Sequence, residues 1–151
     1  INDPDPIQNA RPLELIDVRF AIEAHICRLC VLNAGADDFN ELEKLLLKME
    51  ASLDDPKNFS RFDTLFHAQL AETTRNKLLK WIIQQINAVR NNNEWLSMRS
   101  LTLNQKTIRE YNIAHREIVE AIRARDADLA AKLMRDHLQS ARLSVTRAMD
   151  T

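Results

Sequence analysis

The chain has 151 residues, of which 45% are hydrophobic and 28% charged, and its formal net charge is −1. This composition suits one folded domain with a buried core, and the near-neutral charge argues against nucleic-acid binding by this chain alone. No apolar run reaches the roughly 20 residues that span a bilayer, so we expect no membrane segment.

The amino-acid composition predicts that the chain is helical throughout. There is a single glycine, Gly35, and three of the four prolines lie within residues 1–12. The interior is rich in Leu, Ala, Glu, Lys and Arg, which favour helix. We therefore expect an all-α antiparallel bundle of about six helices over residues 12–151, preceded by a polar, proline-broken tail at 1–11. The chain begins with Ile1 rather than Met, so we expect a fragment or a processed product.

The first helix is predicted from near Pro12 to near Asn33, with Gly35 as its C-terminal stop. Arg19 falls within its apolar stripe, where a charge needs a partner; an internal salt bridge and a snorkelling side chain are both possible. Cys27 and Cys30 form a C-x-x-C pair in the same helix. Without a second such pair, buried core thiols are favoured over a redox or metal pair. Two unpaired thiols suit a reducing cytoplasm, where we place the protein.

The second helix is predicted to open at Asp38, with Glu41 completing a capping box, and to end at the Asp54-Asp55-Pro56 break. A third helix, capped by Ser60, carries Asp63 and His67. Their i, i+4 spacing puts a carboxylate and an imidazole on one helix face. The alternative for Asp63 is an acidic residue in the first turn, favoured there by the helix dipole.

The fourth helix is predicted to begin after Asn76, a favourable N-cap residue. Leu79, Ile83, Ile86 and Arg90 then recur at helical spacing, so Arg90 points inward unless the helix emerges into solvent by that point. An apolar patch of undefined geometry follows, made of Trp95, Leu96, Met98 and Leu101.

Two further helices each carry a histidine in the apolar stripe: His115 in a helix over roughly Lys106 to Ala124, and His137 in one that opens at Asp126. Taken singly, each histidine is best explained as a buried core residue whose ring nitrogens are hydrogen-bonded. Taken together with Asp63 and His67, they predict a divalent metal site, with zinc as the first choice and nickel or manganese as alternatives.

With these residues placed, the chain resembles the C-terminal effector-binding (FCD) domain of FadR-type regulators in the GntR superfamily of bacterial transcription factors. The matching stretches run in order from Pro12 to about Arg142. They are Pro12-Leu13-Glu14-Leu15 with Arg19 and Glu23, Asp63 to Leu70, Asn76 to Leu79, Ile113 to Ile118, Ala121 to Asp126, and Ala130 to Leu138.

The resemblance implies a metal held by Asp63, His67, His115 and His137 in a central metal and effector pocket. It also implies a homodimer and a missing N-terminal winged helix-turn-helix that binds operator DNA in the full-length protein, with residues 1–11 as the linker from it. The stretch Leu13-Glu14-Leu15, with Arg90, Trp95 and Arg99, looks most like the branch that senses sugar acids. A small organic acid effector is therefore expected, bound by Arg19, Arg90 and Asn76.

Two other functions stay open at this point. A metal-dependent enzyme acting on small carboxylates would use the same ion to activate water, with Glu110 or Glu117 as a base. A plain helical interaction module would use the histidines as core residues. We predict a sensing domain and no enzyme, because the motif blocks supply no obvious general base.

Overall fold

The computed structural model describes residues 5–149, and over that range the chain forms α-helices, one 3-10 helix and no strand. This confirms the predicted all-α class. Residues 1–4 of the predicted tail and 150–151 lie outside the described range. None of the helices within it is both long and apolar enough to cross a membrane. The elements are α1 (Pro6–Asn9), α2 (Pro12–Asn33), α3 (Ala36–Glu50), α4 (Pro56–Thr73), α5 (Lys77–Asn87), η1 (Ala88–Asn91), α6 (Asn93–Thr102), α7 (Gln105–Arg123) and α8 (Ala127–Met149).

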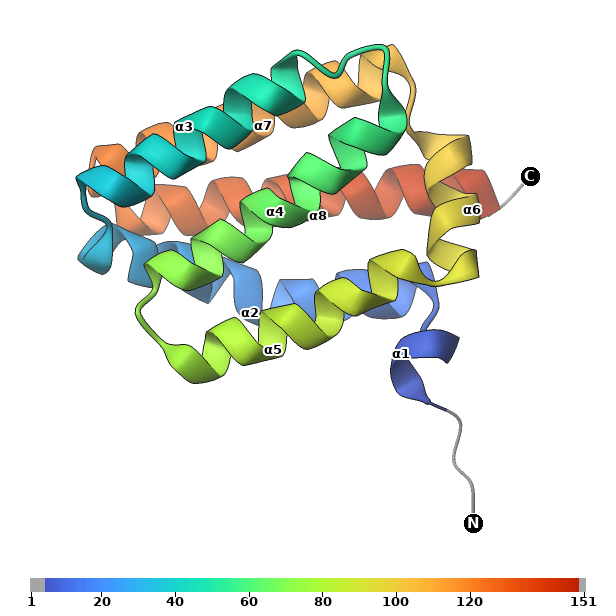
Figure 1. The fold of residues 1–151 in the computed structure, drawn as a ribbon, viewed down its shortest axis with the longest axis horizontal. Helices are drawn as coiled ribbons and strands as arrows, with labels where there is room; N and C mark the ends of the chain where they lie inside the picture. Colours follow the sequence, from blue (N-terminus) through green and yellow to red (C-terminus); the bar gives the residue numbers. More distant parts are fainter. Residues whose placement is uncertain (1–4, 150–151) are drawn as a thin grey trace.

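The six predicted helices correspond to α2, α3, α4, α5, α7 and α8, which alternate in direction along the long axis of the molecule (Figure 1). Helix α8 packs against α2 and α7, while α3 packs against α4 and α7. The shorter α6 crosses the end of the bundle near the C-terminal end of α8. The antiparallel bundle is thus confirmed, with α1, η1 and α6 as additional short elements.

Two helix starts differ from the prediction. Helix α3 begins at Ala36, and the carboxylate of Asp38 accepts a hydrogen bond from the Gly35 backbone, so Asp38 lies inside the helix. Gly35 is the N-cap of α3, and Ala34 is the C-cap of α2. Helix α4 begins at Pro56 with Asp55 as its cap, so the predicted Ser60 cap is wrong.

The earlier start of α4 decides the role of Asp63. It puts Asp63 in the middle of that helix, beyond the reach of the N-terminal dipole, so the first-turn alternative for this residue is wrong. The predicted caps at Asn76 and Asp126 are confirmed, since they accept from the backbone N–H groups of Leu79 and Leu129.

The apolar core has two parts. The larger lies among α2, α3, α4, α7 and α8, and the smaller lies where α6 crosses, built from Leu15, Ile16, Val89, Trp95, Met98 and Val145. Cys27 and Cys30 are free and fully buried in the larger part. Burial raises the pKa of the Cys30 thiol to about 12, and its S–H donates to the Leu70 carbonyl. Both cysteines are therefore core thiols, as favoured from the sequence.

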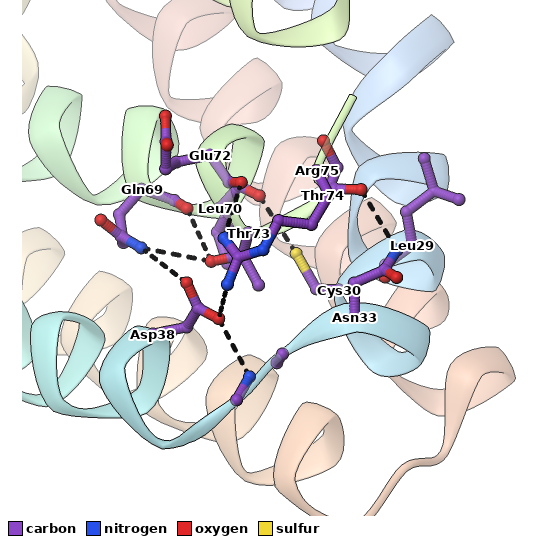
Figure 2. A network of polar contacts seen from close by, with 12 residues as sticks. Leu29, Cys30, Asn33, Asp38, Gln69, Leu70, Glu72, Thr73, Thr74 and Arg75 are labelled. Carbon is purple, nitrogen blue, oxygen red and sulfur yellow. Dashed lines mark hydrogen bonds and ion pairs between the residues drawn. The ribbon is translucent and has the colours of Figure 1, made fainter. Parts of the chain in front are cut away.

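A polar network joins two turns at the end of the bundle away from α6 (Figure 2). Asp38 accepts from Arg75 Nη2 at 2.6 Å and from the Gly35 backbone at 2.9 Å. Arg75 has a φ of 57°, the left-handed conformation that turns the chain from α4 into α5. Asn33 donates to the Thr74 carbonyl at 3.1 Å in the same network. These contacts fix the C-terminal end of α4, the helix that carries two of the predicted metal ligands.

Candidate metal centre

Three helices bring the four predicted ligands together in the interior. Asp63 and His67 come from α4, His115 from α7 and His137 from α8, and none of the four is more than 5% exposed. One nitrogen from each histidine lies within 4.8 Å of the others. The cluster sits at the border between the two parts of the core, because one cavity is lined by both His137 and Trp95.

His67 is oriented by a carboxylate from α2. Its Nδ1 hydrogen-bonds to Glu23. Burial opposes ionisation of Glu23, but Arg19 and His67 outweigh it and hold the Glu23 pKa below its usual range. An ionised carboxylate accepts only, so His67 Nδ1 carries the proton and Nε2 presents a lone pair. This is the arrangement in which a carboxylate orients a metal-binding histidine.

The lone pair of His67 faces another acceptor. Asp63 Oδ1 lies 3.2 Å from Nε2 of His67 and 3.2 Å from Nε2 of His115. Two donor atoms that share one ion at about 2.1 Å lie roughly 3.0–3.4 Å apart. Arg19 Nη2 already approaches His67 Nε2 at 3.0 Å, so a positive group contacts this nitrogen. Acceptors that face each other at this distance require positive charge between them.

Several of these atoms lack a hydrogen-bond partner within the described part of the chain. They include Asp63 Oδ1, both ring nitrogens of His115, and His137 Nδ1. Phe66 packs against the His115 ring at 4.8 Å between centroids. A buried polar atom without a partner costs about 1–3 kcal/mol. One carboxylate oxygen and three imidazoles are the donors that zinc, nickel and manganese accept, so the residues fit a divalent ion.

The second oxygen of Asp63 is held by two arginines. Asp63 Oδ2 accepts from Arg90 Nη1 at 3.0 Å and from Arg99 Nη2 at 2.7 Å. Burial disfavours the charged carboxylate, but its surroundings, with the charge of Arg90 foremost, outweigh burial and hold the Asp63 pKa well below its usual range. Burial lowers the Arg90 pKa to about 10, so Arg90 still carries its charge at neutral pH. Both guanidinium groups lie near the Trp95 ring, at 5.4 and 5.2 Å from its centroid.

Two of the three predicted effector residues lie at this cluster. Arg19 is buried and pairs with Glu23, which is the internal salt bridge considered from the sequence. Arg90 is also buried, so its solvent-facing alternative is wrong. Asn76 lies elsewhere: it is exposed at the start of α5, where it caps that helix.

Two residues beside the histidine cluster, Glu23 and Arg99, were given no role in the sequence analysis. Glu23 lies four residues after Arg19, the i, i+4 spacing at which a buried arginine finds a carboxylate. Arg99 lies in the same segment as the apolar patch from Trp95 to Leu101, whose geometry the sequence left undefined. His25, the fourth histidine of the chain, is exposed on α2 and lies outside the cluster.

The histidines predict a pH dependence for the metal-free protein. Burial lowers the pKa of His115, and burial together with His115 lowers the pKa of His137, both from 6.5. Below pH 6.5 the unfolded chain therefore binds more protons than the folded chain, and stability falls as pH falls. We expect a loss of up to about 1.4 kcal/mol per pH unit for each histidine. Urea unfolding of chelator-treated protein between pH 7.5 and 5 measures this.

The exposed His25 provides the control for that measurement. His25→Gln should leave the pH profile unchanged, since His25 lies at the surface of α2 outside the histidine cluster. His137→Gln should flatten the profile between pH 6.5 and 5. A wild-type profile that is already flat in this range would contradict the assignment of buried neutral imidazoles.

Comparison with known proteins agrees with the family resemblance seen in the sequence. The family model described as the FCD domain matches residues 14–140. The chain is 28% identical over 141 residues to the Uxu operon transcriptional regulator of Escherichia coli (strain K12), covering 91% of this chain and 55% of that protein. It is 32% identical over 127 residues to the HTH-type transcriptional repressor NanR of Citrobacter rodentium (strain ICC168), covering 82% and 46%. The chain spans about half the length of these curated relatives.

Solved structures show the same fold. E. coli McbR/YncC superposes with a TM-score of 0.76 at 18% identity, covering 89% of this chain and 67% of that one. Streptococcus agalactiae GntR gives a TM-score of 0.70 at 27% identity, covering 94% and 60%.

Proposed function

The chain belongs to the FCD domain family, and we propose that it is the sensing domain of a GntR-type transcription regulator that binds a divalent metal ion and a small organic acid. The relatives that it matches are regulators, and the domain is a regulator domain rather than an enzyme. The metal-dependent enzyme considered from the sequence is therefore set aside. We expect zinc, with nickel or manganese as alternatives.

The buried cluster of facing acceptors carries this proposal. Asp63 Oδ1 and His67 Nε2 are both acceptors, lie 3.2 Å apart and are shielded from water. Asp63, His67, His115 and His137 would hold the ion, which when bound supplies a positive charge and open coordination positions. The chain's own part is orientation, because Glu23 fixes the tautomer of His67 while Arg90 and Arg99 hold the carboxylate of Asp63.

The charge balance around the cluster supports an anionic effector. Three arginines and two carboxylates are buried here, Arg19, Arg90, Arg99, Glu23 and Asp63, which leaves a net charge of +1 before any ion binds. A divalent ion raises that charge further, and a bound anion would lower it. The resemblance to the sugar-acid branch makes a hydroxylated carboxylate the best candidate.

We place this domain in a longer, cytoplasmic protein. By resemblance, an N-terminal winged helix-turn-helix would bind operator DNA as part of a homodimer, since operators of this kind have two-fold symmetry. Acid binding would then change the affinity for DNA by coupling between the two sites. Sedimentation of this chain at high micromolar concentration tests the dimer, and a monomer there would exclude it for the isolated domain.

The effector class is tested with matched ligands. D-galacturonate and D-galactose differ only in the carboxylate, so calorimetry on zinc-loaded protein should show binding of the acid and none of the sugar. Glucuronate, gluconate, lactate and citrate extend the series. Tight binding of galactose, or of a cation alone, would refute the proposed class.

A further inference from the structure

A cavity of about 190 Å³ between α7 and α8 has His137 among its lining residues. We call this space the α7–α8 cavity. His137 is the only one of the four candidate ligands that lines it, and it is 5% exposed, against 2% for His67 and 0% for His115. The Nδ1 atom of His137 is buried and has no hydrogen-bond partner within residues 5–149. The cavity, which has room for several water molecules, therefore reaches a candidate ligand with an unpaired nitrogen.

Three carboxylates stand at the exposed end of the α7–α8 cavity. Glu110 and Glu117 lie at i and i+7 on one face of α7, and Asp136 precedes His137 on α8. All three are exposed, and the described lining residues include no lysine or arginine. Asp136 pairs with Lys132 at 2.7 Å, whereas Glu110 and Glu117 have no ion pair within the described chain. The cavity is thus negatively charged where it meets solvent.

Arginines border other parts of the cluster. Arg90 and Arg99 contact Asp63, and Arg19 contacts His67. A divalent ion that approached along these guanidinium groups would be repelled by them. The α7–α8 cavity has the opposite sign, and a hollow lined by negative charge raises the local concentration of cations and the rate at which they bind. Electrostatics therefore favours an approach between α7 and α8.

Two aromatic rings lie where the α7–α8 cavity meets the interior. Tyr111 and His137 line this cavity and also the inner cavity of about 10 Å³ that borders Asp63. Their rings are perpendicular, with 5.1 Å between the centroids. His137 therefore faces both spaces, one open to solvent and one beside the other ligands.

We propose that the α7–α8 cavity is the entry route of the divalent ion, in which the three carboxylates attract the hydrated ion and His137 is the first ligand to meet it. This inference rests on the proposed metal binding and adds the path by which the ion arrives and leaves. It also gives Glu110 and Glu117, considered from the sequence as bases of an enzyme, a role in a sensing domain.

A side chain that fills the cavity tests the route. Ser140 is half-buried in the lining and is not a candidate ligand, so Ser140→Phe narrows the path, and Gln139→Phe, at an exposed position outside the lining, is the matched control. A narrower path slows entry and exit by the same factor and leaves the Kd for zinc unchanged. We expect zinc release from Ser140→Phe to be slower by about tenfold or more, because a small addition to the barrier has this effect. Gln139→Phe should match wild type.

Zinc exchange is measured with a chromogenic chelator. Zinc-loaded protein is mixed with an excess of chelator at concentrations where the rate no longer depends on the chelator, which gives the release rate. Competition with the same chelator at equilibrium gives the Kd for zinc. The ratio of release rate to Kd is the association rate.

Removing charge from the cavity tests the attraction. The double variant Glu110→Gln, Glu117→Gln should bind zinc about tenfold more slowly at low ionic strength, at the lower end of the range for electrostatic steering. The difference should shrink in high salt, which screens exposed charges. Asp136 is left unchanged because it is already paired. Glu94→Gln with Glu120→Gln removes the same charge from exposed positions outside the lining and should leave the association rate unchanged.

The outcomes separate the route from metal binding itself. If zinc binds wild type but exchanges at wild-type rates in both Ser140→Phe and the Glu110 and Glu117 double variant, the route is wrong and the metal-binding function stands. If wild type holds no zinc, the metal-binding function falls and the route with it. Both glutamates are exposed, so the double variant decides the question even where Ser140→Phe does not fold.

Discussion

Protein reconstituted with zinc should hold one ion per chain and unfold roughly 5–10 °C above the same protein after chelation. The increase follows from linkage, since an ion that binds only the folded chain at about 100 times its Kd adds about 2.7 kcal/mol. His115→Ala should abolish both effects, because His115 is fully buried and both its ring nitrogens lack a hydrogen-bond partner in the described chain. Elemental analysis and thermal unfolding measure the two quantities.

His25→Ala is the control, because this exposed histidine lies on α2 outside the cluster. It should retain both the ion and the increase in unfolding temperature. Equal and negligible zinc in wild type and in alanine variants of Asp63, His67, His115 and His137 would make these residues ordinary core groups. Affinity should also fall as pH drops through the imidazole range, since protons compete with the ion for the same nitrogens.

The long helices could be predicted because each buries a broad apolar stripe. The positions of His115 and His137 within such stripes were enough to place both side chains inward, and the structure puts them in one cluster with Asp63 and His67. Helix starts were less predictable. Asp38 and Ser60 are both good capping residues, but Gly35 and Asp55 precede them and take that position.

Helix α6 was missed for a physical reason. Its buried face is Trp95, Met98, Arg99 and Thr102, a helical i, i+3, i+4, i+7 pattern in which half of the residues are polar. The apolar residues Leu96 and Leu101 are 54% and 70% exposed, so a search for apolar periodicity follows the wrong face. The polar half of the buried face exists because Arg99 pairs with Asp63 of α4, a contact between distant segments that local periodicity cannot show.

The role of Glu23 could not be predicted for the same reason, since it depends on a contact between distant segments. Its i, i+4 partner Arg19 could be anticipated, whereas its contact with His67 depends on how α2 packs against α4. The inward positions of the candidate ligands His115 and His137 could thus be predicted from local periodicity, whereas the contacts of Glu23 and Arg99 depend on how the helices pack.

Asp63→Asn should cause the largest loss of stability in metal-free protein, about 3–5 kcal/mol, because it leaves Arg90 and Arg99 buried without their counter-ion. The measurement is urea unfolding of chelator-treated protein, which separates this effect from the loss of a metal ligand. Asp17→Asn is the control, since Asp17 pairs with Arg142 at the surface, where its side chain is 68% exposed. That change should cost less than about 1 kcal/mol.

A double-mutant cycle identifies the cause of the loss. If unpaired positive charge destabilises Asp63→Asn, then adding Arg99→Gln should recover part of the lost stability, with a coupling of at least about 1 kcal/mol between the two positions. Leu101→Gln, an exposed change on the same helix, should recover nothing. Additive losses in the Asp63 and Arg99 cycle would mean that the ion pair contributes little and that Asp63→Asn acts through packing. A positive coupling would show that the buried arginines require an anion, the property on which acid binding depends.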